Sequence, residues 1–154
     1  MYEQIVVGTD GSTGAMVAVD AAIELARLSG ATLHVVNAEK TVTAYQLAAA
    51  TDVGVPVVEI AESNEAIHAQ AQRLCEQAVD RADRAGVKAE AHCIPGDAAE
   101  ALLTVARDTK CDLLVVGNRG MTGVRRFVLG SVPNKLSHHC PTSLLIVDTS
   151  EART

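Results

Sequence analysis

The residues best suited to chemistry are glycines and one serine at a fixed spacing, G-x2-G-x9-G-S, at Gly117, Gly120, Gly130 and Ser131. They follow the apolar run Leu-Leu-Val-Val at 113–116, which is typical of a strand buried on both faces, and a helical pattern begins after them. At such a junction the backbone N–H groups point outward and the helix dipole favours an anion. Glycine lets a ligand approach the backbone without a Cβ in the way. We interpret this stretch as a site for the phosphate and ribose of a nucleotide, bordered by Val116 and the amide of Val132.

Further candidates for the same site are polar residues after the first apolar run. Thr9 and Asp10 follow residues 5–7, Ile-Val-Val. Asp10 is a candidate ligand of the ribose or of a phosphate-bound Mg²⁺, and the alternative is that Asp10 and Thr9 only form a turn with backbone amides.

Arginines within the glycine pattern could neutralise phosphate. Arg119 lies between the first two glycines and is the stronger candidate. For Arg125 and Arg126, between the second and third glycines, a solvated helix face is favoured instead.

The glycine pattern, residues 5–12 (IVVGTDGS) and residues 143–147 (SLLIV) resemble the ATP-binding branch of the universal stress protein family over nearly the whole chain. The resemblance implies a Rossmann-like, adenine nucleotide alpha-hydrolase-like fold with strand order 3-2-1-4-5, and ATP as ligand. It also implies that the position of Asp10 belongs to the ligand site and that the backbone of Val35 meets the adenine edge. Many ATP-binding relatives carry Ser or Thr where this chain has Pro133, which has no N–H to donate, so cyclic AMP stays open as an alternative ligand.

The resemblance further implies a homodimer. The last strand, between Thr142 and Val147, is an apolar edge, and such edges are normally paired or covered. We expect it to pair with its copy across a two-fold axis.

Apolar periodicity predicts strands alternating with helices, which is the pattern of an α/β protein with a doubly wound parallel sheet and helices on both faces. The expected strands are 5–7, 31–37, 87–94, 113–116 and 143–147, and the main helices begin after Ser12, at Glu62, at Ala98 and near Pro133. Ligands of such sheets bind past the carboxyl ends of the strands, where the strand order reverses. The loops after the first and fourth strands should therefore converge.

The chain is expected to form one domain over residues 1–149 with a frayed tail at 150–154. Residues 38–61 are the least regular part. Either a flap beside the ligand or a plain surface excursion would account for them.

Composition excludes several classes of function. A net charge of −6 argues against general binding to nucleic acid or to anionic membranes, and 2% aromatic residues leave no stacking platform for single strands. No apolar run approaches the ~20 residues of a membrane span, and no secretory signal pattern precedes the first strand. The four cysteines form no CxxC pair, so we expect reduced thiols and a cytoplasmic location.

The chain lacks the P-loop, HExxH and GxSxG motifs, and the glycine loop shows no evident base for an attacking water. We therefore expect a binding module and not a dedicated ATPase, with slow hydrolysis only if Asp10 holds Mg²⁺. An adenylating enzyme is a third hypothesis, but the SGGxDS and HxGH motifs of that group are also missing. His138, His139 and Cys140 are adjacent and so make poor joint metal ligands, and His34 and His68 have no partner at ligand spacing.

Overall fold

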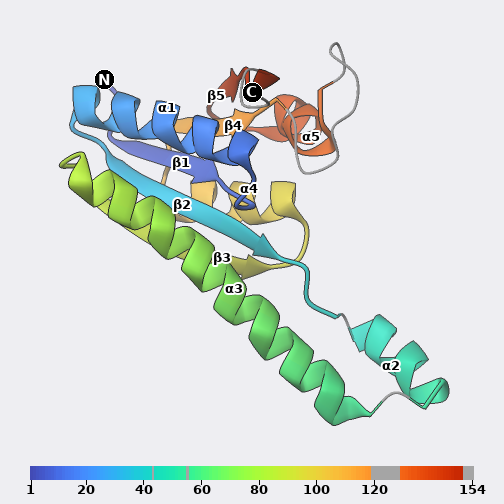
Figure 1. The fold of residues 1–154 in the computed structure, drawn as a ribbon. Helices are drawn as coiled ribbons and strands as arrows, with labels where there is room; N and C mark the ends of the chain where they lie inside the picture. The colour runs from blue at the N-terminus through green and yellow to red at the C-terminus, as the bar shows by residue number, and fades with distance from the viewer. Residues whose placement is uncertain (43, 55, 119–128, 151–154) are drawn as a thin grey trace.

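The computed structural model describes residues 1–42, 44–54, 56–118 and 129–150. Its strands form one parallel sheet in the order β3-β2-β1-β4-β5 (Figure 1), which confirms the predicted fold class and strand order. The strands are β1 (Gln4–Gly8), β2 (Thr32–Glu39), β3 (Ala89–Pro95), β4 (Leu113–Gly117) and β5 (Ser143–Val147). The helices are α1 (Thr13–Ser29), α2 (Ala44–Asp52), α3 (Val57–Arg84), α4 (Ala98–Asp108) and α5 (Ser131–His139).

The central strands are buried on both faces, as the apolar runs predict. On one face Val7 and Val35, partners in the β1–β2 register, pack with α1 and α3. On the other face Val6 and Val116 pack with α4 and with Leu136 of α5. Each of these side chains contributes roughly 1.5–3 kcal/mol through burial, so the two cores hold the strand ends in place.

Helix α3 begins at Val57, five residues before the predicted start at Glu62. Pro56 has φ −63° and ψ 136°, a conformation that suits the residue before a helix. The first turns of α3 and the whole of α2 extend beyond the sheet (Figure 1). Among the described helices, none combines the length and the apolar character that a membrane crossing needs.

Strand β3 begins at Ala89, two residues after the predicted Val87. Gly86 has φ 75° at the end of α3, and the amide of Val87 donates to the carbonyl of Ala82 at 3.0 Å. Val87 therefore belongs to the C-terminal cap of α3 and not to the strand.

Candidate functional site

A cavity of about 620 Å³ opens at the carboxyl ends of β1, β2 and β4, where the loops after the first and fourth strands were expected to converge. Its polar wall is made by Thr9, Asp10, Asn37, Glu39, Lys40, Gln70, Asp97 and Ser131. Its apolar wall includes Val36, Ala38, Ile67, Leu74, Leu102, Val116 and Val132. A cavity lined by both apolar and polar residues suits a ligand with a flat base and a charged tail.

The turn between β1 and α1 is closed by its own hydrogen bonds. The Thr9 hydroxyl accepts from the amide of Gly11 at 3.2 Å, and Oδ1 of Asp10 accepts from the amide of Ser12 at 2.9 Å. Ser12 in turn caps α1, because its hydroxyl accepts from the amide of Ala15 at 3.1 Å. Thr9 and Asp10 thus have the turn-forming role that the sequence left open, and both also line the cavity.

Gly11 fits this turn because of its backbone conformation and its neighbour. Its φ is 77°, and a Cβ built there would lie 2.5 Å from Cδ2 of Leu74 on α3. A side chain at this position would be strained and would push into the cavity wall.

The end of β2 supplies polar residues that the sequence analysis missed. Nδ2 of Asn37 donates to the carbonyl of Thr9 at 2.8 Å and ties the ends of β1 and β2 together. Glu39 is only 4% exposed, and its Oε1 lies 2.6 Å from Nδ1 of His68 on α3. The rule that ligands sit past the carboxyl ends of strands applies to the second strand as well as to the first and fourth, and could have found both residues.

The junction between β4 and α5 is built differently. The amide of Gly130 donates to the carbonyl of Asn118 at 3.0 Å, which fixes the start of α5 against the end of β4. Gly130 is the cap residue, with φ −59° and ψ 165°, and no side chain of the described residues caps the helix. Since any residue can adopt this conformation, the glycine is not needed for backbone geometry. A glycine here has no side chain that could accept from the free amides of the first helical turn.

Helix α5 begins at Ser131, earlier than the predicted start near Pro133, so Ser131 is the first helical residue and not its cap. Asn118 also anchors the segment after β5. Its Oδ1 accepts from the amide of Thr149 at 3.1 Å and from the Thr149 hydroxyl at 2.7 Å. The carboxyl ends of β4 and β5 are thereby joined next to the cavity.

The structure brings most of the predicted site residues together. Those on the cavity wall are Thr9, Asp10, Val116, Gly117, Ser131 and Val132, and Gly130 immediately precedes the last two. The side chain of Val35 instead packs in the core between the sheet and the helices α1 and α3, while its neighbour Val36 faces the cavity. Arg119 and Gly120, like Arg125 and Arg126, lie outside the described residues.

Carboxylates outnumber cations among the described residues that line the cavity. The carboxylates are those of Asp10, Glu39 and Asp97, and the one cation is Lys40. A hydrogen bond from the amide of Glu100 lowers the pKa of Asp97, and Lys135 adds to the effect. An anionic ligand would therefore depend on the backbone amides of α5, on Lys40, or on a cation held by the carboxylates.

Comparison with known proteins agrees with this geometry. A sequence model of the universal stress protein family matches residues 1–148. A universal stress protein of Mycobacterium tuberculosis strain H37Rv is 36% identical, with 97% of this chain and 98% of that one covered. One from Bacillus subtilis strain 168 is 34% identical, with 96% and 99% covered.

Solved structures show the same fold. A universal stress protein crystallised in complex with cyclic AMP is 33% identical, with a TM-score of 0.71 and 97% of this chain and 98% of that one covered. The fold is also that of a universal stress protein of Lactobacillus plantarum, which has a TM-score of 0.79 at 22% identity and covers 95% of this chain and 97% of its own. The chain belongs to the universal stress protein family.

Proposed function

We propose that this chain is an ATP-binding regulatory module of the stress response, which holds an adenine nucleotide in the cavity without dedicated catalysis. The observation that carries the proposal is the start of α5, where Gly130 leaves the amides of Ser131 and Val132 beside the cavity without a side-chain cap among the described residues. An uncapped helix N-terminus that faces a cavity of this size is a ready-made phosphate site.

The rest of the wall suits the other parts of the ligand. The apolar residues Val36, Ala38 and Leu74 would hold the base, and the backbone of Val35 would meet the adenine edge, as the family resemblance implies. Thr9 and Asp10 would lie near the ribose, and the second carboxylate oxygen of Asp10 would serve a phosphate-bound Mg²⁺. Arg119 and Gly120 remain part of the proposed phosphate site, on the strength of the glycine pattern alone.

Cyclic AMP is the second candidate, and specific observations favour it. The protein of known structure that is 33% identical to this chain is in complex with cyclic AMP. The described wall carries more carboxylates than cations, which suits one negative charge better than the several of a triphosphate. Pro133 withholds one further amide from the first turn of α5.

Calorimetric titration tests the proposal and separates the candidates. ATP with and without Mg²⁺, cyclic AMP and GTP would be titrated side by side into the whole chain. We expect saturable binding of one adenine nucleotide per chain and weaker binding of GTP. A large preference for cyclic AMP would replace ATP as the ligand, and absence of binding by both would refute the proposed function.

The lack of dedicated catalysis is part of the same proposal. It predicts that ATP mixed with excess protein stays intact, or is hydrolysed only slowly, during a single turnover. Release of pyrophosphate in that experiment would support an adenylating enzyme instead.

We also propose a homodimer through β5. This strand is an edge of the sheet, and Leu144, Leu145, Ile146 and Val147 on it are only half-buried. An apolar edge of this kind is stabilised when it is covered. Light scattering at micromolar concentration should give the mass of two chains, whereas the mass of one chain would contradict the proposal.

A further inference from the structure

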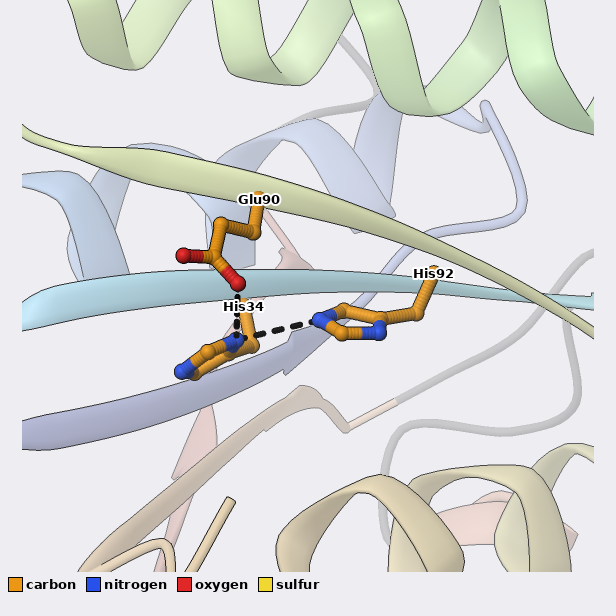
Figure 2. Close-up of side chains that lie close together, drawn as sticks. All are labelled: His34, Glu90 and His92. Atoms are coloured by element: carbon orange, nitrogen blue, oxygen red, sulfur yellow. Dashed lines mark hydrogen bonds and ion pairs between the residues drawn. The ribbon is translucent and has the colours of Figure 1, made fainter. Parts of the chain in front are cut away.

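A second polar cluster lies on β2 and β3, and none of its members lines the cavity. It consists of His34, Glu90 and His92 (Figure 2). Nδ1 of His34 lies 3.0 Å from Nε2 of His92 and 3.8 Å from Oε2 of Glu90. The parallel register, in which His34 is the partner of Glu90, places the three side chains on one face of the sheet beside the β3 edge. In these three residues the ligand atoms lie within 4.8 Å of one another.

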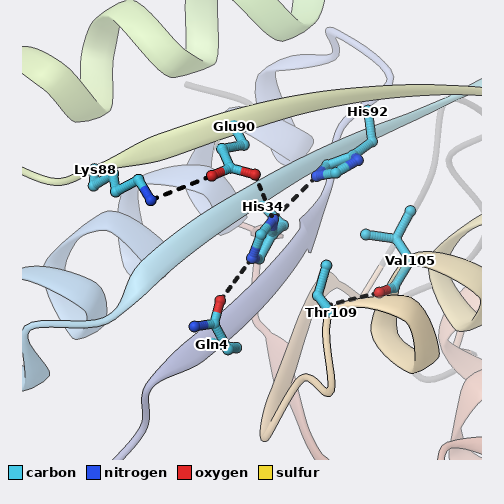
Figure 3. A network of polar contacts seen from close by, with 7 residues as sticks. All are labelled: Gln4, His34, Lys88, Glu90, His92, Val105 and Thr109. Carbon is cyan, nitrogen blue, oxygen red and sulfur yellow. Dashed lines mark hydrogen bonds and ion pairs between the residues drawn. The ribbon is translucent and has the colours of Figure 1, made fainter.

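A fourth residue, Gln4, determines which nitrogens of the two histidine rings carry a proton. Nε2 of His34 lies 2.8 Å from the amide oxygen of Gln4 on β1 (Figure 3). Because a carbonyl oxygen only accepts, Nε2 of His34 carries the proton and Nδ1 presents its lone pair to His92 and Glu90. His34 is 4% exposed, and the hydrogen bond to Gln4 holds its ring in this neutral tautomer. This is the state in which histidine ligates a metal, held by the outer hydrogen bond that such ligands usually make.

We propose that Nδ1 of His34, Nε2 of His92 and a carboxylate oxygen of Glu90 form a binding site for a divalent transition metal ion, with Zn²⁺ as the best-suited ion. Two nitrogens bound tetrahedrally at about 2.0–2.1 Å from Zn²⁺ are about 3.3–3.4 Å apart, so the rings need to separate by only a few tenths of an ångström. The proton of His92 moves from Nε2 to Nδ1 as the metal binds, so neither ring has to lose a proton to solvent. The ion takes the place of the hydrogen that now bridges the two rings.

Exposure and charge complete the site. His34 is buried, whereas Glu90 is exposed and His92 is half-buried, so the ion would be reached from the β3 edge and would keep water in its fourth position. Glu90 supplies one negative charge, and its other oxygen lies 3.4 Å from Nζ of Lys88, which is largely exposed (Figure 3). Two imidazoles and one carboxylate suit Zn²⁺, Cu²⁺ or Ni²⁺ and are a poor set for Mg²⁺ or Ca²⁺.

The test is a titration of the whole chain with ZnCl₂ alone, followed by calorimetry and by ¹⁵N-detected NMR of the imidazole rings. We expect one ion per chain, bound at micromolar concentration or below. The ring signals should show coordination through Nδ1 of His34 with its Nε2 proton retained, and through Nε2 of His92. MgCl₂ at the same concentration should give neither effect.

Substitutions of the two more exposed ligands, His92 and Glu90, test whether Zn²⁺ binds at this cluster and not at other histidines. His92→Ala and Glu90→Gln should each weaken Zn²⁺ binding by more than ~10-fold, while circular dichroism confirms that they fold. The matched control is His139→Ala, which removes an exposed histidine of α5 and should leave Zn²⁺ affinity unchanged. Equal affinity in the parent chain and in His92→Ala would overturn the proposal, as would Zn²⁺ effects confined to His138 and His139.

Gln4 is proposed as a positioning residue, and it has its own test. Gln4→Leu should lower Zn²⁺ affinity by about 10- to 100-fold, and Gln4→Glu, which keeps an acceptor, should restore it. The NMR of the metal-free Gln4→Leu protein should show a mixture of His34 tautomers. Unchanged tautomers would contradict this role. The whole inference is independent of the proposed function, because chains that bind no nucleotide can still be titrated with Zn²⁺.

Discussion

The N-termini of α1 and α5 follow the neighbouring strands β1 and β4 and lie at the same cavity, yet they are capped differently. At α1 the Ser12 hydroxyl caps the helix, and the side chains of Thr9 and Asp10 close the turn before it. At α5 the cap residue is Gly130, and no side chain of the described residues accepts a hydrogen bond from the first amides of the helix. Helix α4, whose start is also near the cavity, resembles α1 because Asp97 caps it.

This difference shows which helix end is left for a ligand. All three helices direct a dipole toward the cavity region, so the dipole alone does not choose among them. At α1 and α4 a side chain caps the helix, whereas at α5 no side chain of the described residues does so. We therefore propose that the phosphate binds at α5, and that the α1 turn serves stability and the ribose side.

The largest expected effect is on nucleotide affinity and comes from adding a side chain at the N-terminus of α5. Gly130→Val keeps an allowed backbone conformation, since φ is −59°, but puts a branched side chain where the phosphate would lie. Nucleotide affinity should fall by more than ~100-fold, about 2.7 kcal/mol, with little change in the melting temperature of the free protein. Calorimetry and thermal unfolding measure the two quantities. Ser137→Val, on the exposed side of α5, is the control, and normal binding by Gly130→Val would place the site elsewhere.

The next effect is on stability and concerns the closed turn. Gly11→Ala combines an unfavourable positive φ with a contact to Leu74, so it should cost more than the ~1–2 kcal/mol of the backbone conformation alone. Gly30→Ala has a similar φ of 74° but nothing within 4 Å of the added Cβ. Urea unfolding of both variants isolates the clash. Equal losses would mean that Leu74 moves aside freely.

A smaller loss is expected from the α1 cap itself. Ser12→Ala removes the hydroxyl that accepts from Ala15 and should lower the free energy of unfolding by about 1 kcal/mol. Its nucleotide affinity should stay within about twofold of the parent, because we propose that the phosphate binds at α5 and not at α1. A loss of affinity as large as that of Gly130→Val would erase the distinction between the two helix ends.

The smallest effect is the pH dependence of the α4 cap. The folded-state pKa of Asp97 is lowered, first by the amide of Glu100 and then by Lys135, so its contribution is present above its unfolded pKa of about 3.9 and is lost as pH falls through the folded value. Urea unfolding between about pH 5 and pH 3 should therefore show a shallower loss of stability in Asp97→Asn than in the parent chain. Identical slopes would show that this cap does not contribute.

Most of the architecture could be read from the sequence, because apolar runs such as residues 113–116 have only one place in an α/β sheet, between two layers of helices. The strand order came from family resemblance and not from periodicity. The start of α3 was predicted too late because residues 38–61 were treated as irregular, although Pro56 within them suits the position before a helix.

The site was predictable where it follows a loop motif and not where it depends on pairing between strands. Thr9 and Asp10 were predicted because they follow a strand, and Ser131 because it follows a glycine that leads into a helix; all three line the cavity. Asn37 was missed because it ends a strand that was predicted as core. Glu39 was missed because it lay in the irregular segment 38–61, whereas the observed β2 extends to Glu39. His34 has no ligand-spaced partner along the chain, since Glu90 and His92 reach it only through the β2–β3 register.

The central claim is that the amides at the N-terminus of α5 bind the phosphate. Its most direct test is an amide NMR titration of the uniformly ¹⁵N-labelled chain with ATP, cyclic AMP and adenosine. We predict that both nucleotides shift the amide signals of Ser131 and Val132 far more than those of Ser12 and Ala15. Adenosine, which has no phosphate, should leave Ser131 and Val132 nearly unchanged while it shifts Val36 and Ala38. Equal shifts at Ser131 and Val132 with and without a phosphate on the ligand would contradict the account.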